Sequence, residues 1–392
     1  MGNAYIVGAV RTPGGKKNGK LSNWHPSDLG ALVLDELVER TGAKGELIDD
    51  VIFGCVSQAG AQSGNVARNA VLGSSLPESV PGTTVDRQCG SSQQAIHFAA
   101  QAVMSETQDI VIAGGVEVMS KVPIGAAIVD SYKAGHGQPF DGKGMTKRYP
   151  GVQFSQFAGA EMMAERWSLS REQLDSFAFA SHQKAINATE EGYFDREIVP
   201  VEGELPSGEK EMVTVDEGIR FDASPESLSG LNILSEDGVL TAGTSSQICD
   251  GAAAIMIVND AGLKKLSIKP RAKIVALALA GDDPVIMLTG PIPASKNVLN
   301  KAKLSIEDID LYEVNEAFAP VPLAWALELG ADLDKLNVNG GAMALGHPLG
   351  GTGAKLMTTL LHELERREAK YGLQAICEGG GTANAMIIER VN

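Results

Sequence analysis

The sequence contains two copies of one pattern of strands and helices, about 260 residues apart. Asp50 begins an apolar run in the first copy, and Asp310 begins the matching run 260 residues later. Cys89 stands just before an apolar helical run, and His347, 258 residues further on, stands before the matching helix. A register kept this closely indicates a duplicated domain.

Glycines end a corresponding run in each copy. Gly114 and Gly115 close "DIVIAGG" in the first copy, and residues 379–381 close "AICEGGG" in the second, at an offset near 265. We expect each glycine group to end its strand in a turn.

Strands alternate with helices within each copy, which predicts an α/β layered fold with a mostly parallel sheet. Ligands of open α/β sheets gather beyond the carboxyl ends of strands, so equivalent turns of the two copies can face one cleft. The reactive side chains at such turns are Cys89, Asn315, His347 and Cys377.

The section between the two copies differs from them in amino-acid composition. Residues 132–151 are rich in glycine and polar side chains, which is typical of exposed loops. A helical run follows, in which Ser170 and Gln173 have the spacing of a capping box. Because an apolar strand then returns, we expect this section to be a lid inserted into the first half. The expected units are residues 1–118 with 249–269, the lid at 119–248, and residues 270–392.

Composition excludes several functions. The formal net charge of −16 and the pI near 4.9 argue against binding of nucleic acid or anionic membranes. No apolar run reaches the length of a membrane span, and no signal peptide is recognisable, so we expect a cytoplasmic protein. The four cysteines and six histidines lack metal-ligand spacing, so we expect no metal site.

The residues around Cys89 allow two interpretations of this cysteine. A free cysteine is most often a small buried residue, so Cys89 can be a packing residue. The apolar spacing of Ala95, Ile96 and Ala99 predicts a helix that begins just after it. The positive end of that helix favours a thiolate, which suits a nucleophile.

Seven motifs occur in order along the chain: "VDRQCGSSQQA", "IAGGVEVMS", "TAGTSSQICDGAAA", "TGPIPAS", "VNEAFA", "NVNGGAMALGHPLGGTGAKL" and "ICEGGG". With these motifs, the whole chain resembles the thiolase family. The resemblance implies two thiolase-fold halves in α-β-α-β-α layers with an inserted lid. It also implies a reversible Claisen reaction on acyl-CoA thioesters, with coenzyme A as co-substrate, no permanently bound cofactor, and a homodimer or homotetramer.

The family's catalytic roles map onto five residues here. Cys89 matches the nucleophile that carries the acyl group, and His347 matches the base that takes its proton. Cys377 matches the second cysteine, an acid and base for the α-carbon and for the thiol of CoA. The backbone N–H of Gly379, with that of Cys89, matches an oxyanion hole, and Asn315 matches the residue that orients a water in a second one.

Other positions match CoA contacts of the family. Ser246 and Arg220 fall where the pantetheine and the nucleotide end are bound, and Phe318 falls in the pantetheine tunnel. For Arg220, an ordinary surface arginine is an equal alternative.

Several residues depart from the common pattern. Asp86 and Cys249 stand where asparagine is frequent, and this resembles thiolases that degrade longer or bulkier acyl-CoAs, including steroid side chains. Gln156 and Phe157 replace a Met-Gly pair of short-chain enzymes, and Met287 is the other expected pocket wall. We therefore expect a degradative 3-ketoacyl-CoA thiolase, with a biosynthetic acetoacetyl-CoA thiolase as the alternative.

Other classes are weighed against this reading. A decarboxylating ketoacyl synthase would have a second histidine where Cys377 stands, and a hydroxymethylglutaryl-type synthase would need a glutamate base that these motifs lack. A catalytically silent acyl-CoA or lipid carrier is the alternative from a different class, since fold alone does not establish activity.

Overall fold

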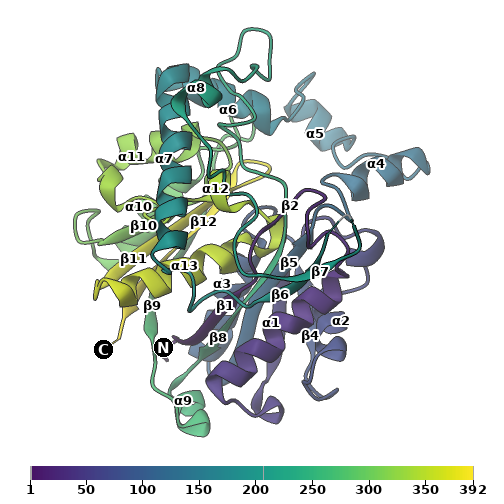
Figure 1. Ribbon diagram of the computed structural model, residues 1–392, viewed down its shortest axis with the longest axis vertical. Coiled ribbons are helices and arrows are strands. Elements are labelled where there is room, and N and C mark those ends of the chain that lie inside the picture. Colours follow the sequence, from purple (N-terminus) through teal and green to yellow (C-terminus); the bar gives the residue numbers. More distant parts are fainter. Residues whose placement is uncertain (1, 206, 392) are drawn as a thin grey trace.

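The computed structural model describes residues 2–205 and 207–391, and within them ten strands form one central sheet. The order along the sheet is β10-β11-β12-β9-β1-β8-β5-β3-β4, with β2 beside β8 (Figure 1). The strands are β1 (Tyr5–Arg11), β2 (Gly15–Lys16), β3 (Asp50–Gly54), β4 (Gly82–Val85), β5 (Ile110–Val118), β8 (Cys249–Val258), β9 (Ala272–Gly281), β10 (Leu311–Val314), β11 (Tyr371–Glu378) and β12 (Thr382–Arg390).

Helices lie in three layers around the two halves of this sheet. One apolar core joins the first half to the outer helices α1 and α2, and another joins the second half to α10 and α11. A third core lies between the halves and is built around α3 and α13. The expected five-layer arrangement follows from these cores. The helices are α1 (Pro26–Thr41), α2 (Val66–Gly73), α3 (Ser91–Met104), α9 (Asp260–Leu266), α10 (Pro291–Ala302), α11 (Pro320–Leu329), α12 (Ala342–Leu345) and α13 (Thr352–Arg366).

Strand β8 shows why the halves need helices on both sides. Its even-numbered apolar residues from Ala252 to Val258 face the outer core, and the odd-numbered ones from Ala253 to Ile257 face the middle core. Side chains alternate between the two faces of a strand, so a continuous apolar run is buried on both faces.

The duplication is regular in space. Helix α3 begins at Ser91 and helix α13 at Thr352, 261 residues later, and β5 and β11 begin at Ile110 and Tyr371, also 261 apart. The two halves are joined edge to edge where β1 pairs with β9.

The expectation of a mostly parallel sheet is wrong. Strands β3, β4 and β5 are parallel to each other, and so are β10 and β11, but β8 and β12 run antiparallel to their neighbours. Only three residues separate β11 from β12, and a connection that short permits only an antiparallel hairpin.

The first glycine pair was also misread. Gly114 and Gly115 lie inside β5, which continues to Val118, instead of ending it. A Cβ on Gly115 would lie 2.2 Å from the carbonyl oxygen of Gly350, and one on Gly114 would lie 2.3 Å from that of Ala253. These glycines permit close backbone approach and are not turn residues.

The inserted section contains α4 (Ala126–Lys133), α5 (Lys143–Arg148), α6 (Gln156–Arg166), α7 (Arg171–Glu190), β6 (Val201–Glu204), β7 (Lys210–Val213) and α8 (Pro225–Ser229). Figure 1 shows α6, α7 and α8 against the second half, and α4 and α5 extending from the body. The capping box of Ser170 and Gln173 is confirmed at the start of α7. Residues 132–151, expected to be loop, include α5 and the end of α4.

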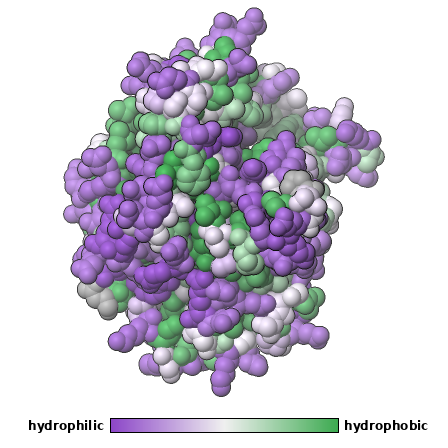
Figure 2. Space-filling model, viewed as in Figure 1, coloured by the Kyte–Doolittle hydropathy of each residue, from purple (hydrophilic) through white to green (hydrophobic). Residues whose placement is uncertain are grey.

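The face of the molecule seen in Figure 2 is mainly polar, with apolar side chains among the polar ones. In residues 2–205 and 207–391 no helix is both long enough and apolar enough to span a bilayer.

A buried ionic cluster fastens the inserted section to the two halves. Arg11 of β1 is fully buried and donates to Glu197 over 2.5 Å and to both oxygens of Asp216 over 2.9 and 3.0 Å. Lys355 of α13 adds an ion pair of 3.3 Å to Asp216, and Thr359 donates to Glu197 over 2.8 Å. Burial opposes ionisation of Asp216, but the charges of Arg11 and Lys355 keep its pKa below the usual value.

Replacing Arg11 with leucine should destabilise the whole chain, because it leaves two buried carboxylates without their main partner. The expected loss is about 3–5 kcal/mol in the free energy of unfolding, measured by urea denaturation. Lys210→Leu is the control, since the Lys210–Glu202 pair is exposed and should contribute nothing measurable. Equal urea midpoints for the Arg11 variant and the unmodified chain would contradict a stabilising role for the cluster.

Candidate active site

Two helix N-termini meet between the halves of the sheet. The backbone N–H of Ala354 in α13 donates to the Ser92 hydroxyl of α3 over 2.9 Å. The helices approach so closely that a Cβ on Gly353 would lie 2.2 Å from a backbone nitrogen of α3. Cys89 precedes α3 and His347 precedes α13, so this contact brings both turns to one place.

The end of β3 supports both turns. A Cβ on Gly54 would lie 2.4 Å from the backbone nitrogen of Ser92 and 2.5 Å from the carbonyl oxygen of Gly350. Gly350 belongs to the 3-10 turn Leu349–Gly351 before α13, and its N–H donates to the buried Glu117 carboxylate over 2.9 Å. Only a residue without a side chain fits at position 54, so this glycine allows the two turns to approach.

Cys89 lies in the turn between β4 and α3. The residue is partly exposed, although protein atoms surround its thiol. Gln88 before it has a φ of +48°, and its N–H donates to Asp86 over 2.8 Å. Burial, followed by the carboxylate of Glu378, raises the pKa of the Cys89 thiol to about 12. The helix end favours a thiolate, but burial and then the Glu378 carboxylate outweigh it, so Cys89 rests as a thiol and needs a base to remove its proton.

His347 is held in one orientation and one tautomer. Its Nδ1 lies 2.5 Å from the Thr352 hydroxyl, and that hydroxyl donates its proton to the Pro348 carbonyl over 2.9 Å. Nδ1 must then carry the proton and donate it to Thr352, which leaves Nε2 as an acceptor. The Asn315 amide lies 3.4 Å from Nε2, which agrees. Burial, with the nearby charge of Lys355, lowers the pKa of His347 to about 3, so the imidazole is neutral.

Asn315 is positioned by the strand that precedes it. It follows β10 directly, and its backbone N–H donates to Ala375 of β11 over 3.1 Å. Its side-chain oxygen is buried and has no hydrogen-bond partner among the described residues. A buried acceptor of this kind beside His347 is suited to a donor such as an ordered water.

Cys377 and Gly379 lie at the end of β11. Cys377 is buried in an apolar cluster with Met287 and Phe318. Burial raises the pKa of its thiol well above the usual value, with a further contribution from Cys89, so it also rests protonated. A Cβ on Gly379 would lie 3.0 Å from the Gln88 side chain, so this backbone adjoins the Cys89 turn.

The structure thus gathers Cys89, His347, Asn315, Cys377 and Gly379 around the two helix N-termini. Two further residues escaped the sequence analysis: Thr352 lies five residues after His347 in the same turn, and Glu378 directly follows Cys377. For Glu316, which follows Asn315, the sequence allows either a hydrogen-bond partner or a solvated charge. Glu316 is buried and accepts hydrogen bonds from Ser181, Asn337 and Met343, so it is not the solvated charge that a turn suggests.

The candidate CoA contacts differ in their exposure. Ser246 is partly exposed, and its N–H donates over 2.9 Å to Ala317, beside the buried Phe318. Arg220 has an exposed side chain, and its backbone N–H donates to His182 over 3.2 Å. Ser246 and Phe318 therefore adjoin the cluster of Cys377, whereas Arg220 lies on the surface.

The candidate pocket residues meet where α6 packs on the second half. Phe157 forms an edge-on contact with Phe318, with ring centroids 5.3 Å apart. Met287 belongs to the same apolar cluster as Phe318 and Cys377, and a Cβ on Gly159 of α6 would lie 3.5 Å from Met287. Gln156 is the first residue of α6.

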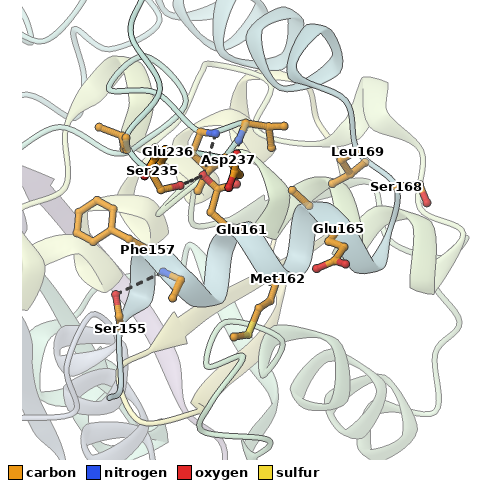
Figure 3. Close-up of a pocket in the computed structure, with 16 residues that line it drawn as sticks. Ser155, Phe157, Glu161, Met162, Glu165, Ser168, Leu169, Ser235, Glu236 and Asp237 are labelled. Atoms are coloured by element: carbon orange, nitrogen blue, oxygen red, sulfur yellow. Dashed lines mark hydrogen bonds between the residues drawn. The ribbon is translucent and has the colours of Figure 1, made fainter. Parts of the chain in front are cut away.

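A cavity of about 1180 Å³ lies between α6 and residues 234–240, with Phe157 among its lining residues (Figure 3). Its apolar walls include Met162, Leu234 and Leu240. Carboxylates also line it, and Glu161 accepts hydrogen bonds from Ser235 and two backbone N–H groups. Phosphate groups would be repelled there, so the cavity is not suited to the nucleotide end of CoA.

Comparisons with known proteins match the chain to thiolases along its full length. The family model of the N-terminal domain of thiolase matches residues 4–261, and that of the C-terminal domain matches residues 268–390. A steroid 3-ketoacyl-CoA thiolase of Mycobacterium tuberculosis is 51% identical over 392 residues, covering 100% of this chain and 95% of that protein. A 3-ketoacyl-CoA thiolase of Aliivibrio fischeri is 42% identical over 397 residues, covering 100% of both.

Two solved structures share the fold. The crystal structures of the Bacillus anthracis acetyl-CoA acetyltransferase and of human mitochondrial 3-ketoacyl-CoA thiolase both match with TM-scores of 0.90. Their identities to this chain are 38% and 36%, and each match covers 100% of this chain and 99% of the other. The chain therefore belongs to the thiolase family.

Proposed function

We propose that the protein is a degradative thiolase that cleaves a 3-ketoacyl-CoA with free CoA to give an acyl-CoA and acetyl-CoA. The observation that carries this proposal is the gathering of two cysteines, a neutral histidine and an asparagine where α3 and α13 meet. The names of the M. tuberculosis and A. fischeri relatives favour the degradative direction.

In the first half-reaction, the Cys89 thiol gives its proton to Nε2 of His347, and the sulfur attacks the ketone carbon of the substrate. The N–H groups of Cys89 and Gly379 stabilise the developing oxyanion in the acyl-transfer steps. The bond between the α-carbon and the ketone carbon then breaks, and the α-carbon takes a proton from Cys377. Acetyl-CoA leaves, and the acyl group stays on Cys89.

In the second half-reaction, the Cys377 thiolate takes the proton of the incoming CoA thiol. The CoA sulfur attacks the acyl thioester, Cys89 leaves as the thiolate, and it regains its proton from His347. Both cysteines and the histidine return to the neutral forms that burial favours.

The acyl group is proposed to be larger than acetyl. Phe157 lies half exposed at the start of α6, between Phe318 and the cavity, so space is available beside the expected acyl wall. Ser246, Phe318 and, at the surface, Arg220 are the proposed CoA contacts, and Gln156 and Met287 the further pocket walls.

The assignment of the two cysteines is tested by acylation. Brief exposure to acetyl-CoA, octanoyl-CoA and a ring-bearing acyl-CoA should add one acyl mass at Cys89, measured by intact mass and peptide mapping. Cys89→Ala should take up none. Cys377→Ala should still be acylated but lose turnover, on the order of a thousandfold or more, because no base remains for CoA.

The rival functions give different results in the same experiment. A silent carrier would bind acyl-CoA without an adduct, and a biosynthetic acetoacetyl-CoA enzyme would accept only the acetyl group. Near-normal thiolysis by Cys377→Ala would show that another group is the second base.

We expect Thr352 to support catalysis by fixing the tautomer of His347. Thr352→Val removes the acceptor of the Nδ1 proton, so the ring can place its proton on Nε2, where it cannot accept the proton of Cys89. The expected result is a fall in kcat of at least about tenfold with little change in KM. Thr352→Ser keeps the hydroxyl and should keep kcat, and a Thr352→Val enzyme with full kcat would contradict this role.

A second copy of this chain is the proposed partner. Strand β4 is the last strand of the sheet and pairs only with β3 among the described strands, which leaves an open edge beside the Cys89 turn. Leu72 of α2 and Phe98 of α3, which flank β4, are 54% and 40% exposed. Pairing of two β4 edges would cover these apolar side chains.

Sedimentation equilibrium should therefore show a dimer or a larger homo-oligomer. Phe98→Lys should weaken this association by at least about tenfold, because it places a charge in the covered surface. Leu327→Lys is the matched control, since Leu327 is exposed on α11, away from β4. A monomer at micromolar concentration would refute the proposed partner.

A further inference from the structure

Glu378 is a buried carboxylate at the reaction centre that the steps above do not use. It ends β11 directly after Cys377, and its side chain has no exposed surface. Successive side chains of a strand point to opposite faces. Cys377 faces the apolar cluster of the lid, whereas Glu378 faces the middle layer, where α3 begins.

The Glu378 carboxylate occupies the space that a side chain at position 90, directly after Cys89, would fill. A Cβ on Gly90 would lie 2.1 Å from Oε1 of Glu378 and 2.8 Å from the amide nitrogen of Asn384. Gly90 is the N-cap of α3 and supplies no capping side chain of its own. Glu378 therefore lies at the positive end of the helix that follows Cys89.

The two oxygens of this carboxylate differ. Oε2 accepts a hydrogen bond from Thr382 over 2.7 Å. Oε1 is buried and lacks a hydrogen-bond partner within the described part of the chain. A buried carboxylate with one free oxygen acts on its surroundings mainly through its charge.

The groups around Glu378 come from three segments. Arg87 and Cys89 lie in the turn before α3, Cys377 precedes it on β11, and Thr382 lies on β12. Burial raises the pKa of Glu378 to about 7, although Thr382 and Arg87 oppose this shift. Other charged groups that act on these neighbours are Asp86 and Glu117, which raise the pKa of Cys89, and His97, a titratable group of α3 that responds to Arg87.

We propose that Glu378 is a positioning residue that controls the charge on Cys89. As a carboxylate it takes the positive end of α3 and makes the thiolate of Cys89 less favourable, and as a neutral acid it leaves that helix end free to stabilise the thiolate as it forms. Glu378 exchanges its own proton with solvent, while the proton of Cys89 still passes to Nε2 of His347. The role serves the proposed acyl transfer, but its effect on the thiol needs no substrate.

The test is the alkylation of Cys89 by iodoacetamide across pH 6 to 10 on the full chain, followed by peptide mapping. Glu378→Gln keeps the shape and a partner for Thr382 but removes the charge. At a fixed pH between 8 and 10, where Glu378 of the unmodified chain is ionised, the rate should rise about tenfold, because loss of the charge lowers the pKa of the Cys89 thiol by about one pH unit. Glu389→Gln, which changes a partly exposed carboxylate near the other end of β12, should leave the profile unchanged.

A second variant gives a graded result. Thr382→Val removes the hydrogen bond that favours the carboxylate, so Glu378 should stay protonated to higher pH. Alkylation should then be faster than in the unmodified chain just above pH 7. At higher pH, where Glu378 is ionised in both proteins, the rates should converge.

The outcomes separate this proposal from the proposed function. A folded Glu378→Gln protein with an unchanged alkylation profile overturns the proposal, and so does an unchanged Thr382→Val profile if Glu378→Gln does not fold. Acylation of Cys89 by acyl-CoA tests the thiolase reaction separately. A shifted alkylation profile without acylation would refute the reaction and leave the role of Glu378 standing.

Discussion

The contact between the N-termini of α3 and α13 is the feature on which the rest of the site depends. It places one turn from each half of the sheet within reach of the other, and it exists because the facing backbone positions have no side chains. Gly54, Gly350 and Gly353 each occupy a point where a Cβ would lie about 2.5 Å or less from another backbone atom. Rigid secondary structure, and not loop flexibility, therefore determines the distances between the reacting groups.

The reacting side chains of the site are all electrically neutral at rest. Cys89, Cys377 and His347 are all held uncharged by burial, so the first proton transfer creates two opposite charges at once. Such a pair stabilises itself in a site of low dielectric constant, whereas a single charge would be costly there. Glu378, whose pKa lies about 7, is the nearby group that can change this balance.

Much of this could be predicted from the sequence, because the repeat and the short turn motifs are local signals. The duplicated halves, the inserted section and the candidate residues follow from spacing and from the family resemblance. The antiparallel direction of β8 and β12 could not be predicted from the sequence, because tertiary packing decides which strands pair. The high pKa of the Cys89 thiol was not evident from the sequence either, since its local helix favours a thiolate, whereas burial and then Glu378, almost 300 residues away, oppose it. Thr352 was missed because its role depends on a hydroxyl that has already given its proton to Pro348.

The place of β8 in the sheet has a consequence for how the chain is made. In the first half, β8 lies between β1 and β5, yet it is synthesised about 130 residues after β5 ends. While the ribosome makes the inserted section, the emerging half-sheet lacks its central strand, and the apolar edges of β1 and β5 face water. Such edges are prone to pair with other nascent chains. The inserted section must therefore be synthesised, and its two ends brought together, before the first half can close, so the edges of β1 and β5 stay open to other chains from the emergence of β5 until that of β8.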